Sequence, residues 1–257
     1  MNLLLSNDDG FDSEGINILA KKLSQNHNVY LIAPDSNRSA VSNHISMTTS
    51  NTLVKIDENI WSCSGYPVDC VFVGLESNLL GVKIDGVVSG INKGANMGTD
   101  IIYSGTCAIA RQAVLSGIPA VALSLDPVSW DTIKQDGFKF EALADFASKN
   151  IEKLLSLSKM EPPRAFVNIN ALSVENYKGV KFAEKPCTRV YGDKTIVIHD
   201  KDDKYHTEFV MGRNQTPLLS NTDFGICREG YIEISLVYAD PIFAEMPKIV
   251  DYKDFSL

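Results

Sequence analysis

The sequence predicts an α/β protein built on a doubly wound, mainly parallel sheet with a layer of helices on each face. Short apolar runs bounded by turn residues alternate with segments whose apolar residues recur at helical spacing. Such alternation implies parallel strands joined by right-handed crossovers. The segments that follow the apolar runs are polar, as expected of loops at the carboxyl edge of such a sheet. We therefore expect a three-layer α/β/α architecture.

Composition limits the domain organisation and the partners. The chain has 257 residues, 44% hydrophobic and 22% charged, which fits one large domain or two small ones. The net charge of −8 argues against a nucleic-acid polymer or an anionic membrane as the main partner. No leader-like N-terminus and no apolar segment of roughly 18 residues is present, so we expect a cytoplasmic protein. The five cysteines form no CxxC pair, which predicts reduced thiols in the core.

The first part of the chain has a strand-helix-strand pattern. Leu3 to Leu5 is a short apolar run typical of a buried strand, and Ser13-Glu14 opens a helix with apolar residues at helical spacing. A second buried strand is expected over Asn28 to Pro34. The polar arm that follows, Ala40 to Asn59, is too long to be a plain connector.

The remainder continues the alternation and then changes character. In chain order we expect a helix from Pro67 with an apolar face reaching Leu79, a strand over 84–88, a loop with three glycines over 89–98, a helix from Ser104 to about Ser116, a strand over 119–125, a helix over 140–154 and a strand over 165–169. Two short alternating segments, 194–199 and 204–211, predict a hairpin with an acidic tip, an appendage of a kind that often mediates assembly. A helix over 222–228 and a strand over 231–237 follow.

Two adjacent acids follow the first strand. Asp8 and Asp9 raise each other's pKa unless a cation neutralises them, so a metal site explains their position. A helix N-cap with a spare acid, or a simple Asp-Gly turn, would also fit this segment alone. The loops after the second and third strands should reach the same edge of the sheet, where Ser39 and Asn92 would add a hydroxyl and an amide oxygen. An all-oxygen set of this kind suits Mg²⁺ or Mn²⁺.

A second feature at this edge suits an anion. The glycine-containing loop offers backbone N–H groups, and Ser104-Gly105-Thr106 stands at the start of a helix, where the helix dipole favours a phosphate group. Taken alone, glycines are often only turn residues, and a Ser or Thr before a helix is usually only a cap. The convergence of acids and anion-binding groups on one edge predicts phosphoryl chemistry.

Five segments resemble the SurE survival-protein family over most of the chain. They are LLLSNDDG at 3–10, APDSNRSAVSN at 33–43, GYPVDCV at 65–71, VVSGINKGANMGTDIIYSGT at 87–106 and REGYIEIS at 228–235. The resemblance implies a single domain over 1–257 with a Rossmann-like core and an oligomerisation hairpin at about 180–214. It further implies a homodimer or homotetramer built partly through a swapped C-terminal segment. Ser235-Leu236-Val237 departs from the family's usual Thr-Pro-Leu, which leaves the C-terminal contacts around Asp240 open.

The resemblance also implies an activity and a set of functional residues. The family comprises metal-dependent phosphatases that hydrolyse nucleoside 5′-monophosphates, often with activity on 3′-monophosphates and short polyphosphate. One divalent cation per subunit, Mg²⁺ or Mn²⁺, would be held by Asp8, Asp9, Ser39 and Asn92. Asn96, Ser104, Gly105 and Thr106 match the positions that contact phosphate.

Two mechanisms and one different function remain open at this point. Asp8 or Asp9 would orient a water that attacks phosphorus, or Asp8 would itself be the nucleophile and form an aspartyl-phosphate. A carboxylate held by a cation is a poor nucleophile, which favours water. A non-catalytic nucleotide-binding or sensing protein could share the fold, but it would gain nothing from two acids facing its anion. A dinucleotide-dependent oxidoreductase is disfavoured because no G-x-G-x-x-G follows the first strand.

Overall fold

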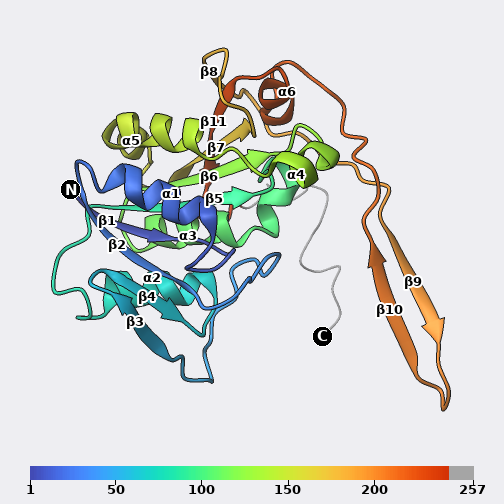
Figure 1. Ribbon diagram of the computed structural model, residues 1–257, viewed down its shortest axis with the longest axis horizontal. Coiled ribbons are helices and arrows are strands. Elements are labelled where there is room, and N and C mark those ends of the chain that lie inside the picture. The colour runs from blue at the N-terminus through green and yellow to red at the C-terminus, as the bar shows by residue number, and fades with distance from the viewer. Residues whose placement is uncertain (243–257) are drawn as a thin grey trace, which may run out of the picture.

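The architecture is a nine-stranded sheet between two layers of helices, and a computed structural model describes residues 1–242 of it (Figure 1). The strand order is β3-β4-β2-β1-β5-β6-β7-β11-β8. Five central strands run parallel: β2 (Asn28–Pro34), β1 (Asn2–Ser6), β5 (Gly86–Lys93), β6 (Ala120–Asp126) and β7 (Ala165–Leu172). The order changes direction at β1, so the loops after β1, β2 and β5 meet at one edge.

The outer strands complete the sheet on both sides. Beyond β2, β4 (Ile60–Cys63) is parallel to it and β3 (Leu53–Asp57) is antiparallel to β4. Beyond β7, β11 (Ile232–Tyr238) is antiparallel to it and β8 (Val180–Phe182) is parallel to β11. The sheet is therefore mainly parallel, as predicted, with antiparallel pairs towards its ends.

Helices cover both faces of the sheet because its central strands are apolar on both sides. α1 (Glu14–Leu23) and α5 (Glu141–Ser156) lie on one face, where they share a core with Leu3 and Leu5. α2 (Pro67–Glu76) and α3 (Gly105–Leu115) lie on the other face, where they share a core with Leu4. Successive side chains of a strand point to opposite faces, so the run Leu3-Leu4-Leu5 supplies both cores.

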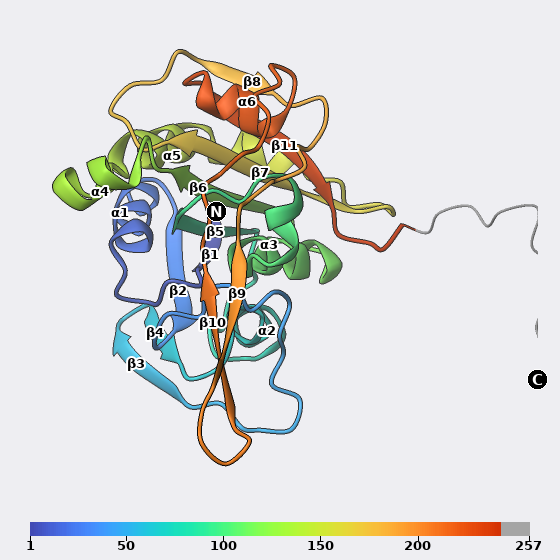
Figure 2. The ribbon, with the colours of Figure 1, turned by 90° about the vertical axis from the view of Figure 1, so that its right-hand side faces the viewer.

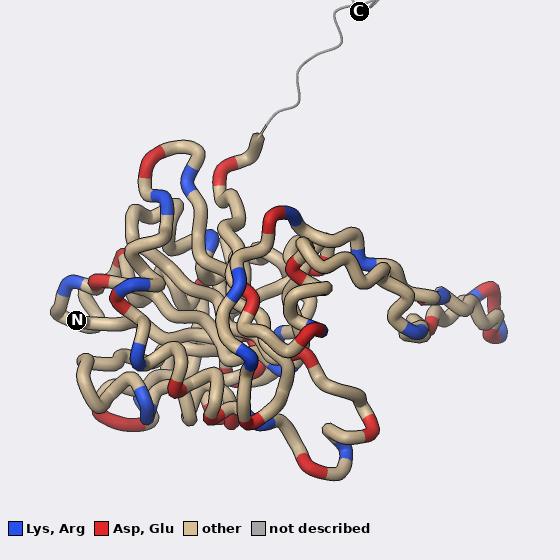
Figure 3. Tube along the Cα trace, turned by 90° about the horizontal axis from the view of Figure 1, so that it is seen from above, with Lys and Arg blue, Asp and Glu red and all other residues tan. Residues whose placement is uncertain are grey.

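Smaller elements lie at the carboxyl edge and beyond the sheet. They are the 3-10 helix η1 (Gly98–Ile102), α4 (Trp130–Asp136), α6 (Asp223–Arg228) and a separate antiparallel hairpin of β9 (Lys194–His199) and β10 (Tyr205–Val210). The hairpin projects away from the body, and every residue of its two strands is exposed (Figures 1 and 2). Acidic and basic residues are interspersed along the described trace (Figure 3).

The structure confirms the predicted fold class and several element boundaries. β2 has the predicted bounds, Ser104 is the N-cap of α3, and the hairpin forms where the alternating segments predicted it. All five cysteines are free and buried, which confirms the expected core thiols. Within residues 1–242, no helix has the length and apolar character that crossing a membrane requires.

Other elements differ from the predictions for identifiable reasons. The polar arm contains β3 (Leu53–Asp57), an exposed edge strand of five residues that is not predicted from the sequence because the Ser, Thr and Asn residues before it dominate the composition of the arm. The strand predicted over 84–88 starts at Gly86 and runs on to Lys93, since Ser89 and Gly90 are buried within it. α2 ends at Glu76, and Leu79 lies outside it with 40% of its surface exposed. The swapped C-terminal segment stays a prediction, and within this chain Asp240 pairs with Arg164, whose Nη1 lies 3.3 Å from Asp240 Oδ1.

A truncation in the α1 and α5 core should destabilise the fold strongly. Phe140 is fully buried at the N-cap of α5, where a Cβ on Gly15 of α1 would approach its ring to 2.9 Å. We expect Phe140→Ala to lower the free energy of unfolding by about 3–5 kcal/mol, measured by urea denaturation. Phe182→Ala, at a side chain 63% exposed, is the matched control and should change it by less than about 0.5 kcal/mol. Equal losses in the two variants would contradict this assignment of the core.

Candidate active site

The turn after β1 is fixed by the side chain of Asn7. Its Nδ2 donates hydrogen bonds to the carbonyl of Gly10 at 2.9 Å and to the hydroxyl of Ser13 at 2.7 Å, and its Oδ1 accepts from the Gly10 N–H at 3.1 Å. Gly10 has φ +111°, a conformation that favours glycine. The motif Asn-Asp-Asp-Gly therefore makes a closed turn that presents Asp8 and Asp9 at the sheet edge.

Asp8 lies directly against the start of α3. Its Oδ1 accepts a 2.6 Å hydrogen bond from the hydroxyl of Thr106, and both groups are buried. A Cβ on Gly105 would lie 2.8 Å from Asp8 Oδ2, so glycine is required for this approach. Burial raises the pKa of Asp8 to about 6, and the charge of Asp9 adds to the rise, while the Thr106 hydrogen bond opposes it.

Asp9 connects the loops that follow β2 and β5. Its Oδ2 accepts a hydrogen bond from the Lys93 N–H at 3.3 Å and its Oδ1 accepts one from Asn37 Nδ2 at 3.5 Å. Asn37 Oδ1 in turn accepts from the Ser39 N–H at 2.9 Å. Burial raises the pKa of Asp9, and the hydrogen bond from Lys93 opposes this rise. The backbone of three loops is thus held together around the two acids.

Asn92 follows an irregularity in β5 and directly precedes Lys93, whose N–H donates to Asp9. The pairing of β5 with β6 shifts register between Ser89 and Asn92, and Gly90 adopts φ +116° where a Cβ would lie 2.3 Å from the Leu123 carbonyl oxygen. Asn92 Nδ2 donates to the Gly94 carbonyl at 2.8 Å. This hydrogen bond uses the amide N–H group and leaves the Asn92 side-chain oxygen without a hydrogen bond among the described residues.

The oxygen atoms around the acids fit a hard cation. Within residues 1–242, neither Asp8 nor Asp9 forms a salt bridge with a basic side chain, and the Ser39 hydroxyl makes no hydrogen bond. No group of three His, Cys, Asp or Glu side chains with metal-site geometry occurs in this part of the chain. The available donors are two carboxylates, a hydroxyl and an amide oxygen, the ligand types that Mg²⁺ and Mn²⁺ prefer.

The residues predicted to contact phosphate occupy two different surroundings. Ser104, Gly105 and Thr106 form the first turn of α3 beside Asp8, and the Ser104 hydroxyl accepts the Cys107 N–H at 2.9 Å. Asn96 is instead part of a buried amide cluster. Its Nδ2 donates to the Ser124 hydroxyl at 2.8 Å, and no hydrogen bond within the described residues joins it to the acids.

Sequence reasoning missed the cluster that holds Asn96. The Asn96 N–H donates to Asn170 Oδ1 at 2.8 Å, and its carbonyl accepts from Asn168 Nδ2 at 2.9 Å. Asn170 also donates to Glu233 at 3.3 Å, whose pKa burial raises to about 8. The alternating asparagines of the segment NIN in an otherwise apolar strand are the signal that could have indicated this cluster.

A large cleft lies elsewhere at the same edge. Its volume is about 800 Å³, and its walls come from the end of β6, α4, α6 and the base of the hairpin. Asp126, Arg189 and Arg228 line it, whereas Asp8 and Asp9 do not. The acids therefore lie outside this cleft.

Comparisons with known proteins identify the family of the chain. The family model described as Survival protein SurE matches residues 3–192, which is well over half of the sequence. The chain belongs to the SurE family. A protein of Treponema pallidum named 5′-nucleotidase SurE is 44% identical over 187 residues, covering 71% of this chain and 96% of the relative.

Other SurE proteins match over nearly the full length. A 5′-nucleotidase SurE of Campylobacter hominis is 36% identical over 250 residues, covering 93% of each chain. The crystal structure of the SurE protein from Aquifex aeolicus is similar with a TM-score of 0.78 at 29% identity, covering 98% of this chain and 96% of that one. The nine-stranded sheet with its hairpin is thus a SurE fold.

The buried Asp8 carboxylate should make the metal-free protein less stable at neutral pH. Its pKa in the fold, about 6, lies above the ordinary 3.8, so the folded state binds more protons between these values and stability falls as pH rises through them. In chelator at pH 7, we expect Asp8→Asn to be more stable than wild type by up to about 3 kcal/mol in urea denaturation.

The pH and metal dependence of this difference provide its controls. The advantage of Asp8→Asn should shrink as pH falls from about 6 to 4 and disappear by about pH 3, where Asp8 is protonated in both the folded and the unfolded state of wild type. Added Mg²⁺ or Mn²⁺ should reduce it by stabilising wild type alone. A variant less stable than wild type at pH 7 in chelator would show that groups of the protein itself stabilise the charged Asp8 carboxylate.

Proposed function

We propose that this SurE protein is a 5′-nucleotidase that hydrolyses nucleoside 5′-monophosphates to nucleoside and phosphate with one divalent cation per subunit. The names of its relatives support the reaction. The observation that carries the proposal is the pair Asp8 and Asp9, both with raised pKa and neither in a salt bridge among the described residues, beside the first turn of α3. Two acids facing an anion-binding helix start are unfavourable unless a cation lies between the acids and the anion.

The cation would be Mg²⁺ or Mn²⁺, held by Asp8, Asp9, Ser39 and Asn92. When bound, it supplies positive charge that polarises a phosphoryl oxygen and activates a water. The donor chemistry supports these residues, because in the described part of the chain neither acid forms a salt bridge and the side-chain oxygens of Ser39 and Asn92 accept no hydrogen bond. The substrate range would extend to 3′-monophosphates and short polyphosphate, since a phosphate group is the part of the substrate that this edge recognises.

The protein's own groups would position the reactants. The first turn of α3 directs backbone N–H groups and the positive end of its dipole towards the phosphate, through Gly105 and Thr106. Ser104 caps this turn and keeps it in place. Thr106 holds Asp8 in one orientation, from which Asp8 or Asp9 would orient the attacking water.

Attack by water fits the contacts of Asp8 better than an aspartyl-phosphate. One carboxylate oxygen of Asp8 accepts the Thr106 hydrogen bond, and the other faces Gly105 at the start of α3. A nucleophilic Asp8 would have to give up its cation contact to attack phosphorus. We therefore assign both acids to cation binding and to orientation of the water.

The exposed hairpin would serve assembly into an oligomer. Residues 1–257 would form one domain whose hairpin, within about 180–214, joins subunits into a dimer or tetramer in the cytoplasm. The hairpin strands expose Val197 and Phe209, and Met211 beside them is 81% exposed. An isolated two-stranded hairpin is marginally stable in water, so contact with another subunit would account for it.

Phosphate release tests the proposed activity. Wild type should release phosphate from nucleoside 5′-monophosphates with Mg²⁺ or Mn²⁺ and not with chelator. Asp9→Asn should lose activity by about a thousandfold or more, because it removes a charged cation ligand whose contribution to transition-state stabilisation is several kcal/mol. Asp12→Asn, at an exposed acid in the same turn, is the matched control and should keep wild-type activity.

Two results would contradict the proposal. Full activity in chelator would exclude the cation, and equal activity of Asp9→Asn and wild type would exclude the acid pair. Nucleotide binding without phosphate release under any metal would favour a nucleotide-binding protein instead.

A further inference from the structure

The loop between β5 and α3 contacts residues 187–191, the segment that leads into the hairpin. This loop, residues 94–104, contains η1 and carries Asn96 near one end and Ser104 at the other. We propose that Arg189 and Tyr191, acting through Asp100, are positioning residues that hold this loop in the geometry that binds the substrate phosphate. The inference rests on the proposed function, since it concerns the same phosphate site.

The hairpin segment and the loop touch at Gly98. A Cβ on Gly98 would lie 2.1 Å from the Cys187 carbonyl oxygen, and Gly98 itself has φ +55°. Asp223 joins the two segments: its Oδ2 accepts the Gly98 N–H at 2.6 Å and its Oδ1 accepts the Cys187 N–H at 2.8 Å. Residues before the hairpin and residues of the loop therefore share one buried carboxylate.

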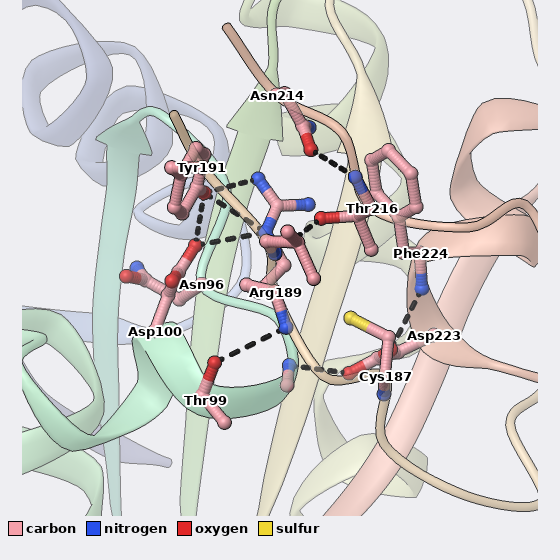
Figure 4. Close-up of polar contacts among 12 residues, drawn as sticks. Asn96, Thr99, Asp100, Cys187, Arg189, Tyr191, Asn214, Thr216, Asp223 and Phe224 are labelled. Carbon is pink, nitrogen blue, oxygen red and sulfur yellow. Dashed lines mark hydrogen bonds and ion pairs between the residues drawn. The ribbon is translucent and has the colours of Figure 1, made fainter. Parts of the chain in front are cut away.

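A chain of polar contacts extends from this point along η1. The Arg189 N–H donates to the Thr99 hydroxyl at 3.2 Å, and Arg189 Nε lies 3.0 Å from Asp100 Oδ2. The Tyr191 hydroxyl donates to the same Asp100 oxygen at 2.5 Å and accepts from Arg189 Nε at 2.9 Å. Figure 4 shows these side chains converging on Asp100 from the hairpin segment.

The buried contacts of Arg189 fix the position of Asp100 but add little to the stability of the fold. The Arg189 side chain is only 6% exposed, its guanidinium lies 4.6 Å from the centre of the Phe224 ring, and its Nη1 is buried without a hydrogen-bond partner. A buried ion pair with an unpartnered N–H carries a desolvation penalty that offsets much of its attraction. Its distinctive property is directional: the planar guanidinium and the tyrosine hydroxyl both contact Asp100 Oδ2, and together they allow the Asp100 carboxylate only one position.

The loop is buried in part, at Asn96, Met97 and Ile101, while the stretch just before Ser104 is exposed. Ile102 and Tyr103 are 61% and 63% exposed. The end of η1 is tied to the polar arm, where Ser42 donates through its N–H to the Tyr103 carbonyl at 3.0 Å and through its hydroxyl to the Ile102 carbonyl at 2.8 Å. The exposed stretch before Ser104 is thus held by polar contacts on two sides, one from the arm and one from the hairpin segment.

Two conservative substitutions test the positioning role in the full-length protein with Mg²⁺. Tyr191→Phe removes only the hydroxyl, and Arg189→Lys keeps the charge but loses the planar donor. We expect each to raise both the KM for a nucleoside monophosphate and the inhibition constant of inorganic phosphate by about fivefold to tenfold, with kcat within about twofold of wild type. Tyr205→Phe, at an exposed hairpin tyrosine, is the matched control and should leave both constants unchanged.

Hydrogen exchange gives a readout that does not depend on activity. The amides of Gly98 and Tyr103, which are hydrogen-bonded to Asp223 and Asp100, should exchange faster in Tyr191→Phe than in wild type or Tyr205→Phe. Faster exchange together with weaker phosphate binding supports the proposal. An unchanged KM and an unchanged phosphate constant in both variants overturn it, whether or not exchange changes, because the contact would then be structural only.

Phosphate release by wild type distinguishes a failure of the proposed nucleotidase function from a failure of the positioning role. If wild type releases no phosphate from any nucleoside monophosphate, the nucleotidase assignment fails. Calorimetric affinity for inorganic phosphate then replaces KM: a drop of about fivefold or more in both variants still supports the positioning role, and an unchanged affinity overturns it.

Discussion

The buried carboxylate of Asp8 at the end of the central strand constrains the whole carboxyl edge of the sheet. Its contact with Gly105 sets where α3 begins, and its backbone carbonyl accepts the Arg38 N–H at 2.7 Å, which sets where the loop after β2 lies. Asp9 extends the same arrangement to Lys93. A strand, a helix start and two loops are thus positioned around charge that the described protein does not neutralise, an arrangement that a cation would complete.

The sequence was most informative where one local pattern decides the structure. Strands buried on both faces are continuous apolar runs, so β1, β2 and β6 could be read directly, and the hairpin followed from alternation. The convergence of the acids with the loops after β2 and β5 followed from the rule that parallel strands end at one edge. The cation and phosphate roles of these residues stay predictions.

Features that depend on distant partners could not be read from the sequence. β3 is a short exposed edge strand, and its alternating Val54-Lys55-Ile56-Asp57 lies within a long arm whose preceding residues are polar, so the arm as a whole does not read as a strand. The amide cluster around Asn96 is formed by β6, β7 and β11, and only the tertiary structure shows that Asn96 faces Ser124. Asp100 and Tyr191 are 91 positions apart, and nothing in either segment predicts their contact.

The central position of β1 has a consequence for synthesis of the protein. The N-terminal strand is made first, yet it lies between β2 and β5, and Asp8 meets Thr106 only across 98 positions of chain. During translation, the two acids emerge from the ribosome long before the helix start that faces them, and β11 with Glu233 comes later still. Folding dominated by such distant pairings is slow, so the nascent chain carries its acidic turn, and an apolar strand that only β2 can pair, until β5 and α3 have been made.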